Sequence, residues 1–434
     1  MTSENSGLVR AIGRWSLAAL VVNAIIGSGI FGLPADVARL VGRFSPLAWL
    51  AAAVPIAFII ACFAEVSSRF SEAGGPYLYT RAALGRFLAI LTGWLMWLVR
   101  LTAAAAGANL FVTYLREFWP GATDPVARMT VLGLLIFGLA LVNVFGIRSG
   151  TLVSNLFTVA KLAPLAALIA GGLLWMALAR PAPPAHAFAA AGWRQWMDAV
   201  LLLVFAYGGF EAALIPMGEA RNPRRDAPFA LFVALITCIV VYTLIQVVVM
   251  GTVADPAHAQ RPLAEAARAI RGDRAAALVT LGALVSVFGY MSAMLIVAPR
   301  LTFALAEEGD FPRFFAELEP RYRTPHVSIL GFAVMSWLLA VLGNFQWNVL
   351  LSALSRLFTY ALVCLALPVL RRQQPQGAQF HLPAAPLFVT LGAGLSLALL
   401  TRMGPLEARI MAVTALIALA NWVWVRGRPA GHSP

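Results

Sequence analysis

The amino-acid sequence predicts an all-α integral membrane protein of about 12 transmembrane helices, and three observations carry this prediction. Hydrophobic residues make up 61% of the 434-residue chain and charged residues only 12%, about half of the charged fraction usual in soluble domains. Runs of about 20 apolar residues, long enough to cross a bilayer core, recur along the chain. Polar residues do not alternate with apolar ones as they do in a transmembrane barrel.

The apolar runs are expected to form a single transmembrane domain over residues 1–434. The first run is too long for a cleavable signal peptide and should remain as the first span. We expect two successive groups of five helices, at 10–178 and 195–370, followed by two additional helices at 383–425. The twelve runs lie at 14–40, 46–66, 86–115, 127–146, 153–178, 195–217, 228–251, 275–305, 327–344, 347–370, 383–401 and 409–425.

Clustered glycines interrupt the first and the sixth of these runs. The first contains "NAIIGSGIFGLP" and the sixth "LVFAYGGFEAALIP". Glycine costs a helix about 1 kcal/mol relative to alanine, so such clusters mark places where helical winding fails. Discontinuous helices at matching positions of two halves indicate a 5+5 inverted-repeat secondary transporter with its binding site at the midplane. The alternative is that the glycines only permit close helix packing.

The predicted breaks expose backbone groups of both polarities. Freed amides at the start of the second half-helix favour a carboxylate, and carbonyls that end the preceding half-helices suit an ammonium. This combination predicts an α-amino acid as the substrate. A weakly charged pocket favours a neutral side chain, with a cationic one as the runner-up. The candidate substrate-binding residues are Ile25, Ile26, Gly27, Ser28, Gly29, Phe205, Ala206, Tyr207 and Gly208.

Lys161 is the only lysine among the 32 basic residues, and it lies inside the fifth apolar run. An ammonium inside a membrane costs at least about 2.5 kcal/mol, so such residues are usually functional; snorkelling to the interface is the alternative. We expect Lys161 to contact the freed carbonyls near Ile26 and Gly27 and to couple its charge to transport. Ser286 and Glu211 are further coupling candidates, although Glu211 equally suits a helix cap or a contact with a cationic substrate.

Other polar and aromatic residues within the runs carry weaker expectations. Phe210, Ala103 and Asn109 are candidates for gating or for lining the pocket. Arg100 and Arg356 either line a water-filled path or form paired structural charges. Glu65 closes the second run and is expected near the membrane interface.

Charge and motifs exclude several classes of protein and orient the chain. The net charge is +13, but the arginines are spread over short loops, which argues against a nucleic-acid partner. Their distribution places both termini in the cytoplasm. The sequence has no phosphate-binding loop and no catalytic constellation, so we expect neither a nucleotide-driven pump nor an enzyme, and no cofactor or metal. A channel and a retinal-binding photoreceptor remain remote alternatives.

Five segments resemble one known family, the amino acid–polyamine–organocation (APC) superfamily of permeases. They are "GSGIFGLP", "FAYGGFE", "GEARNPRRDAP", "EAGGPYLYTRAALG" at 72–85 and "APRLTFALAEEGDFP" at 298–312. The resemblance implies a multi-pass inner-membrane transporter of amino acids with the 5+5 fold. It also implies that Lys161, in "TVAKLAPL", takes the place of a sodium ion used by other members of the fold, which favours sodium-independent proton symport. Exchangers carry the same lysine and stay the alternative, and the oligomeric state is open.

Overall fold

The computed structural model describes residues 12–72, 74–145, 151–179, 191–215 and 220–427. Within these ranges the regular structure is helical, apart from one isolated parallel bridge between Ile12 and Ala220. The predicted all-α class is therefore confirmed.

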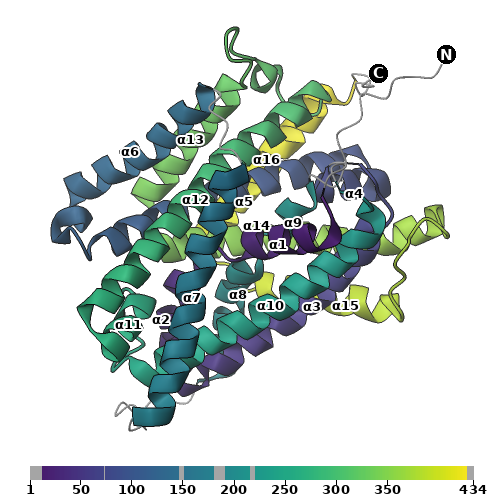
Figure 1. The fold of residues 1–434 in the computed structure, drawn as a ribbon. Helices are drawn as coiled ribbons and strands as arrows, with labels where there is room; N and C mark the ends of the chain where they lie inside the picture. The colour runs from purple at the N-terminus through teal and green to yellow at the C-terminus, as the bar shows by residue number, and fades with distance from the viewer. Residues whose placement is uncertain (1–11, 73, 146–150, 180–190, 216–219, 428–434) are drawn as a thin grey trace.

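The helices follow the predicted apolar runs closely (Figure 1). The first half of the chain contains α1 (Arg14–Ile25), α2 (Gly29–Val41), α3 (Ser45–Ser67), α4 (Gly75–Leu84), α5 (Arg86–Leu115), α6 (Pro125–Val144) and α7 (Thr151–Ala179). The second half contains α8 (Trp193–Tyr207), α9 (Phe210–Ala213), α10 (Pro223–Thr252), α11 (Pro262–Arg271), α12 (Asp273–Glu307), α13 (His326–Leu342), α14 (Phe345–Gln373), α15 (Ala385–Leu400) and α16 (Pro405–Val425). Short 3-10 turns lie at Gly42–Phe44, Pro120–Thr123 and Arg313–Ala316.

The length and hydropathy of these helices suit a bilayer. Among the described residues, nine helical segments are long and apolar enough to cross a membrane, one of them the stretch Gly29–Ser67 that contains α2 and α3. Three further apolar helices, α1, α13 and α15, are shorter. The count of twelve crossings and the two inverted five-helix groups stay predictions.

The first and sixth runs are interrupted where the glycines cluster. α1 ends at Ile25 and α2 begins at Gly29; α8 ends at Tyr207 and α9 begins at Phe210. Gly208 has an extended backbone, whereas Gly209 has a φ of 114°, which side chains other than glycine rarely tolerate. Both predicted discontinuities are therefore present in the structure.

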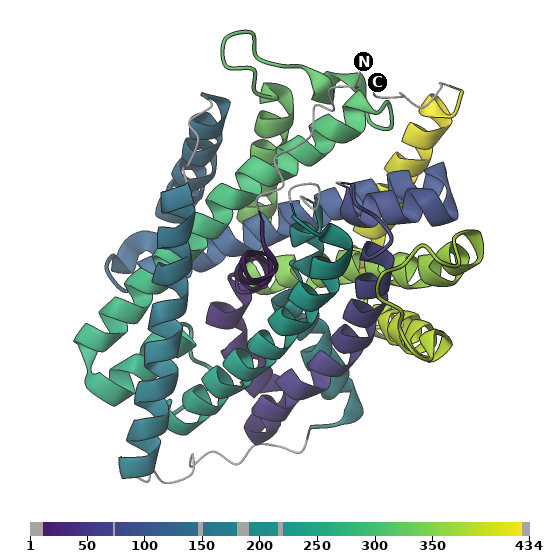
Figure 2. The same cartoon turned by 45° about the vertical axis from the view of Figure 1, so that its right-hand side comes forward.

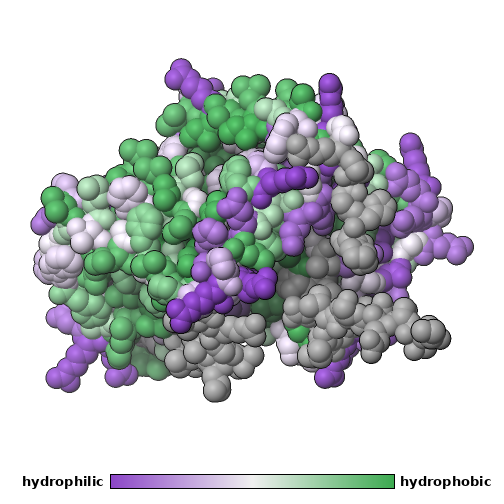
Figure 3. All heavy atoms as spheres, turned by 90° about the horizontal axis from the view of Figure 1, so that it is seen from above, coloured by the Kyte–Doolittle hydropathy of each residue, from purple (hydrophilic) through white to green (hydrophobic). Residues whose placement is uncertain are grey.

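Burial divides the helices into an inner and an outer set. α5 and α14 pack extensively against each other and are mostly buried, whereas most residues of α6, of α16 and of the Lys161–Ala179 part of α7 are not buried. Figure 2 shows α16, in yellow, on the outside of the bundle at the upper right. Apolar side chains form broad green areas on the face in Figure 3, and hydrophilic ones gather toward its middle and right. The apolar periphery, including the 82% exposed Leu342, suits contact with lipid.

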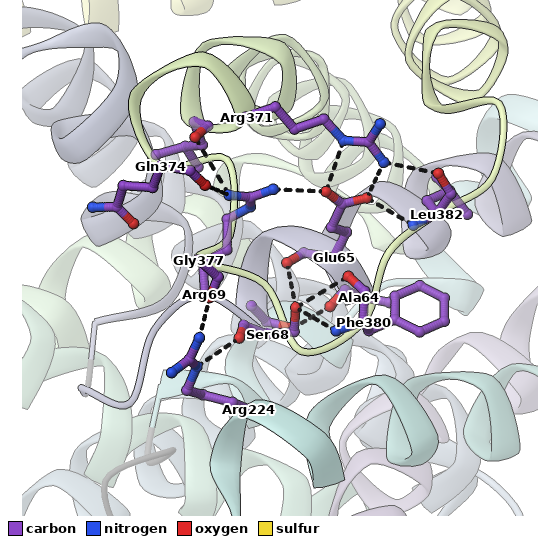
Figure 4. A network of polar contacts seen from close by, with 12 residues as sticks. Ala64, Glu65, Ser68, Arg69, Arg224, Arg371, Gln374, Gly377, Phe380 and Leu382 are labelled. Atoms are coloured by element: carbon purple, nitrogen blue, oxygen red, sulfur yellow. Dashed lines mark hydrogen bonds and ion pairs between the residues drawn. The ribbon is translucent and has the colours of Figure 1, made fainter.

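One end of α3 is fastened by an ionic group, which we call the Glu65 cluster: Glu65, Arg69, Arg371 and the backbone of Leu382 (Figure 4). The Glu65 side chain has no exposed surface. Its carboxylate accepts from Arg69 at 2.8 Å, from Arg371 at 2.5 and 2.8 Å, and from the amide of Leu382 at 2.8 Å. The cluster therefore ties α3 to the end of α14 and to the connection before α15.

Candidate substrate site

The two broken helices cross each other at the breaks. A methyl group on Gly29 would lie 3.0 Å from the Cα atom of Ala206, and one on Gly209 would collide with the carbonyl oxygen of Ala24. The glycines therefore allow the backbone of each break to approach the other, in addition to ending the helices. The predicted residues of the first and sixth runs are brought together, as a shared site requires.

Tyr242 on α10 connects the two breaks. Its hydroxyl lies 3.2 Å from the carbonyl oxygen of Ile25 and 3.0 Å from that of Ala206. In unbroken helices these carbonyls would accept from amides four residues further along. The Tyr242 hydroxyl has a single hydrogen, so it donates to one of these two predicted ammonium-binding carbonyls at a time and leaves the other available. Sequence reasoning missed this residue, and its only signal was a hydroxyl in the middle of an apolar run.

The amides at the first break are free to donate hydrogen bonds to a ligand. Among the described residues, no hydrogen-bond partner is recorded for the amides of Gly27, Ser28 or Gly29, and the buried Ser28 hydroxyl also has none. They lie at the start of α2, where the helix dipole favours an anion. These groups suit the carboxylate for which the sequence predicted them.

A cavity of about 610 Å³ opens beside the breaks. Its deep end is lined by Asn23, Ala24, Arg100, Lys161 and Ser286. It then follows α12 to Tyr77, Arg300 and Glu308, and the Glu308 side chain is 41% exposed. This volume is in the range of pockets that hold small molecules, and the cavity extends from the breaks to the end of the molecule that the arginine distribution predicts to be cytoplasmic.

Lys161 lies at the deep end of this cavity and contacts the helix before the first break. Its ammonium nitrogen lies 2.9 Å from both the backbone and the side-chain oxygen of Asn23. The expected partners were the carbonyls near Ile26 and Gly27, so the structure moves the contact three to four residues toward the start of α1. The reason is that an unbroken helix would use the Asn23 carbonyl for the Gly27 amide, and the break frees it.

Ser286 also lines this cavity, but its buried hydroxyl has no hydrogen-bond partner among the described residues, Lys161 included. Asn23 was not among the predicted site residues. Its polar side chain four positions before Gly27 was the available signal.

Glu211 is held at the second break by three donors. Its carboxylate accepts from Arg356 at 2.9 Å, from the hydroxyl of Tyr360 at 2.9 Å and from the amide of Gly209 at 2.8 Å. The amide contact is a cap at the start of α9, and the Arg356 contact is a buried ion pair. Glu211 therefore caps α9, one of its predicted roles, and Arg356 is a paired charge. Tyr360 was missed by sequence reasoning.

Arg100 on α5 lines both the large cavity and a smaller one of about 20 Å³ beside Glu211. Its side chain is buried and its Nε atom has no partner. No ion pair joins Arg100 to any carboxylate in the described part of the chain. Arg100 thus differs from Arg356, although the sequence gave both the same expectation.

The remaining predicted residues have different surroundings. Ala103 lines the smaller cavity, and Phe210 stacks on Tyr360 with ring centroids 5.1 Å apart. The Tyr207 hydroxyl donates to the carbonyl of Trp49 at 3.0 Å. Asn109 lines neither cavity.

Instead, the amide group of Asn109 donates to the carbonyl of Ala340 at 3.1 Å and accepts from Arg128 at 2.7 Å. Its contacts therefore fasten helices to one another.

The mouth of the large cavity is bordered by a second ionic group, between α4 and the end of α12. Arg81 contacts Glu308 at 2.6 Å, Arg86 contacts Asp310 at 2.6 Å, and the Tyr77 hydroxyl donates to Asp310. Burial, and then the charge of Asp310, raise the pKa of Tyr77 well above its usual range, so Tyr77 is a neutral donor. These contacts fasten α4 beside the mouth.

Comparison with known proteins agrees with this architecture. The methylthioribose transporter of Bacillus subtilis (strain 168) is 26% identical over 412 residues, which are 91% of this chain and 88% of that protein. The branched-chain amino acid permease BcaP of the same organism is 26% identical over 93% of this chain and 90% of its own length. The serine/threonine exchanger SteT, also from Bacillus subtilis (strain 168), is 26% identical over 79% of this chain and 79% of its own length.

The sequence profile of one family, described as amino acid permease, matches residues 12–420. This match spans nearly all of the described helices, both breaks and both cavities. The chain is a multi-pass membrane protein, and it belongs to the amino acid permease family of the APC superfamily.

Proposed function

We propose that this protein is a secondary active transporter that moves amino acids across the membrane by alternating access. The observation that carries the proposal is the meeting of two interrupted helices beside a cavity of about 610 Å³. Unpartnered amides of the first break suit the α-carboxylate of a substrate. The family membership supports amino acids as the substrate class.

We further propose proton symport without sodium, with Lys161 as the coupling group. Lys161 is 4% exposed, lines the cavity and binds Asn23, whose carbonyl is free only because α1 ends two residues later. A charged Lys161 therefore holds α1 in its present position, and loss of the proton weakens that contact. Exchange is the alternative, supported by the similarity to the exchanger SteT.

The proposed orientation puts both termini in the cytoplasm of a cell whose plasma membrane contains the protein. It is supported by the excess of arginine in the loops on that side. In this orientation the large cavity extends toward the cytoplasm, because Arg81, Arg300 and Glu308 border or line its outer end. The structure then corresponds to an inward-directed state of the transport cycle.

The test is uptake of labelled amino acids into proteoliposomes, with and without an inward proton gradient and with and without internal substrate. Uptake driven by the proton gradient without internal substrate and without sodium supports symport. A strict need for internal substrate supports exchange instead. Lys161→Ala is expected to abolish the pH dependence, and uptake that stays proton-driven in this variant would refute the coupling role. Arg409→Ala is the matched control, because it removes a cation at an exposed position on α16, outside the cavity, and should leave the pH dependence of uptake unchanged.

A further inference from the structure

The buried charges around the cavity do not balance. Arg100 and Lys161 line the deep end of the large cavity, and Arg100 and Arg356 line the smaller cavity beside it. Among the described lining residues, the carboxylates are Glu211 in the smaller cavity and Glu308 at the mouth of the large one. Glu211 is already engaged by Arg356, Tyr360 and Gly209. Arg100 is therefore a buried cation that forms no ion pair with any carboxylate of the described chain.

An unpaired buried guanidinium is costly, because removal from water costs several kcal/mol that only a partner anion recovers. Such a residue is retained where a ligand supplies the missing charge. Arg100 lines the substrate cavity and the small cavity next to it, so a bound molecule reaches it from the large cavity. The guanidinium fork matches a carboxylate with two parallel hydrogen bonds.

We infer that the preferred substrate is an acidic amino acid, whose side-chain carboxylate pairs with Arg100. This inference rests on the proposed transport of amino acids and specifies their side chain. The amides of Gly27, Ser28 and Gly29, at the break beside Ala24 of the cavity lining, are the proposed donors to the α-carboxylate, which leaves Arg100 for a second one. A neutral substrate leaves Arg100 unpaired, and a cationic one meets like charge.

The structure thus changes the expectation for the side chain. The sequence favoured a neutral substrate because the predicted pocket was weakly charged apart from Glu211, and a cationic one was the runner-up. The ion pair with Arg356 at 2.9 Å neutralises Glu211, and the charge left over is positive. The sequence contains both arginines, but it does not show which of them Glu211 binds.

The experiment compares acidic amino acids with their neutral isosteres, glutamate with glutamine and aspartate with asparagine, in proteoliposomes. For the parent protein we expect kcat/KM for glutamate to exceed that for glutamine by tenfold or more, because a site built for a charged group rejects the analogue that lacks it. Arg100→Gln is expected to remove this preference by lowering glutamate uptake while glutamine uptake persists. Arg100→Lys keeps the charge and should restore part of the preference.

Arg116→Gln is the matched control, since Arg116 lies at the end of the same helix and contacts Gln260 outside both cavities. It should leave the preference intact. An unchanged ratio in Arg100→Gln, or a parent protein that prefers neutral or cationic amino acids, overturns the inference. An equal loss of glutamate and glutamine also overturns it, because Arg100 would then bind the α-carboxylate.

A binding measurement separates this inference from the proposed function. Glutamate should raise the unfolding temperature of the detergent-solubilised parent protein more than glutamine does, and it should lose this effect in Arg100→Gln. If the parent protein transports no amino acid, the transport proposal fails. The thermal shift then still tests whether Arg100 binds the side-chain carboxylate of glutamate. Equal shifts with glutamate and glutamine refute the site, whatever the transport result.

Discussion

The Glu65 cluster and the deep end of the cavity both bury ionic groups, but only in the Glu65 cluster does every ionic group have an oppositely charged partner. Glu65 has no exposed surface and is contacted by two arginines and a backbone amide. Arg100 is also buried, with 4% of its surface exposed, and has no carboxylate partner within the described residues. A group that satisfies itself fastens helices together, whereas a group that lacks a partner is available to a ligand. Stability and transport measurements can therefore distinguish the two regions.

The largest expected effect is at the centre of the Glu65 cluster. Glu65→Gln keeps the shape of the side chain but leaves Arg69 and Arg371 without their shared anion. Breaking a buried pair from one side costs about 3–5 kcal/mol, so the free energy of unfolding should fall by about this amount. Thermal or denaturant unfolding in detergent measures it. The control Glu317→Gln, at an exposed glutamate, should leave the free energy of unfolding unchanged. If Glu65→Gln is as stable as the parent protein, the cluster does not hold the helices together.

The next effect is at Glu211, which shares features of both regions because it is paired but borders the smaller cavity. Glu211→Gln removes the counter-ion of Arg356, while the amide can still accept from Gly209 and Tyr360. Breaking a buried pair from one side costs about 3–5 kcal/mol. One arginine loses its anion here and two lose it in Glu65→Gln, so this variant should be less stable than the parent protein but more stable than Glu65→Gln.

Glu211→Gln should also increase the excess positive charge next to Arg100. We expect it to retain uptake of glutamate relative to glutamine, measured as the ratio of kcat/KM. A reversal of this ratio toward neutral or cationic substrates would mean that Glu211, and not Arg100, sets the charge preference.

Arg371→Gln in the Glu65 cluster can be compared directly with Arg100→Gln at the cavity, because each variant replaces a buried or partly buried arginine with glutamine. Arg371→Gln removes one of two cations from Glu65, and Arg69 remains at 2.8 Å. The side chain of Arg371 is 33% exposed, so solvent screens part of the loss. We expect destabilisation of about 1–2 kcal/mol, measured by unfolding. The neighbouring Arg372, which is exposed, provides the control as Arg372→Gln.

The contrast also separates what the sequence could predict from what it could not. Apolar runs and glycine clusters are local signals, and they predicted the helices and the breaks at Gly27–Gly29 and Gly208–Gly209 correctly. The partners of buried polar groups depend on distant helices. Lys161 binds Asn23, 138 positions away, and Glu211 binds Arg356, 145 positions away. Hydropathy carries no information about such pairs.

The smallest effect on stability is expected for Arg100→Gln, which is also the variant that should change the substrate preference most. The substitution breaks no ion pair within the described chain and removes a buried charge whose desolvation is uncompensated. Its unfolding temperature without substrate should equal or exceed that of the parent protein. Arg371→Gln, measured in the same experiment, shows how far the unfolding temperature falls when a paired arginine is lost. A fall as large as that of Arg371→Gln would mean that Arg100 has a partner inside the protein, and the distinction between a fastening cluster and a ligand-binding cation would no longer hold.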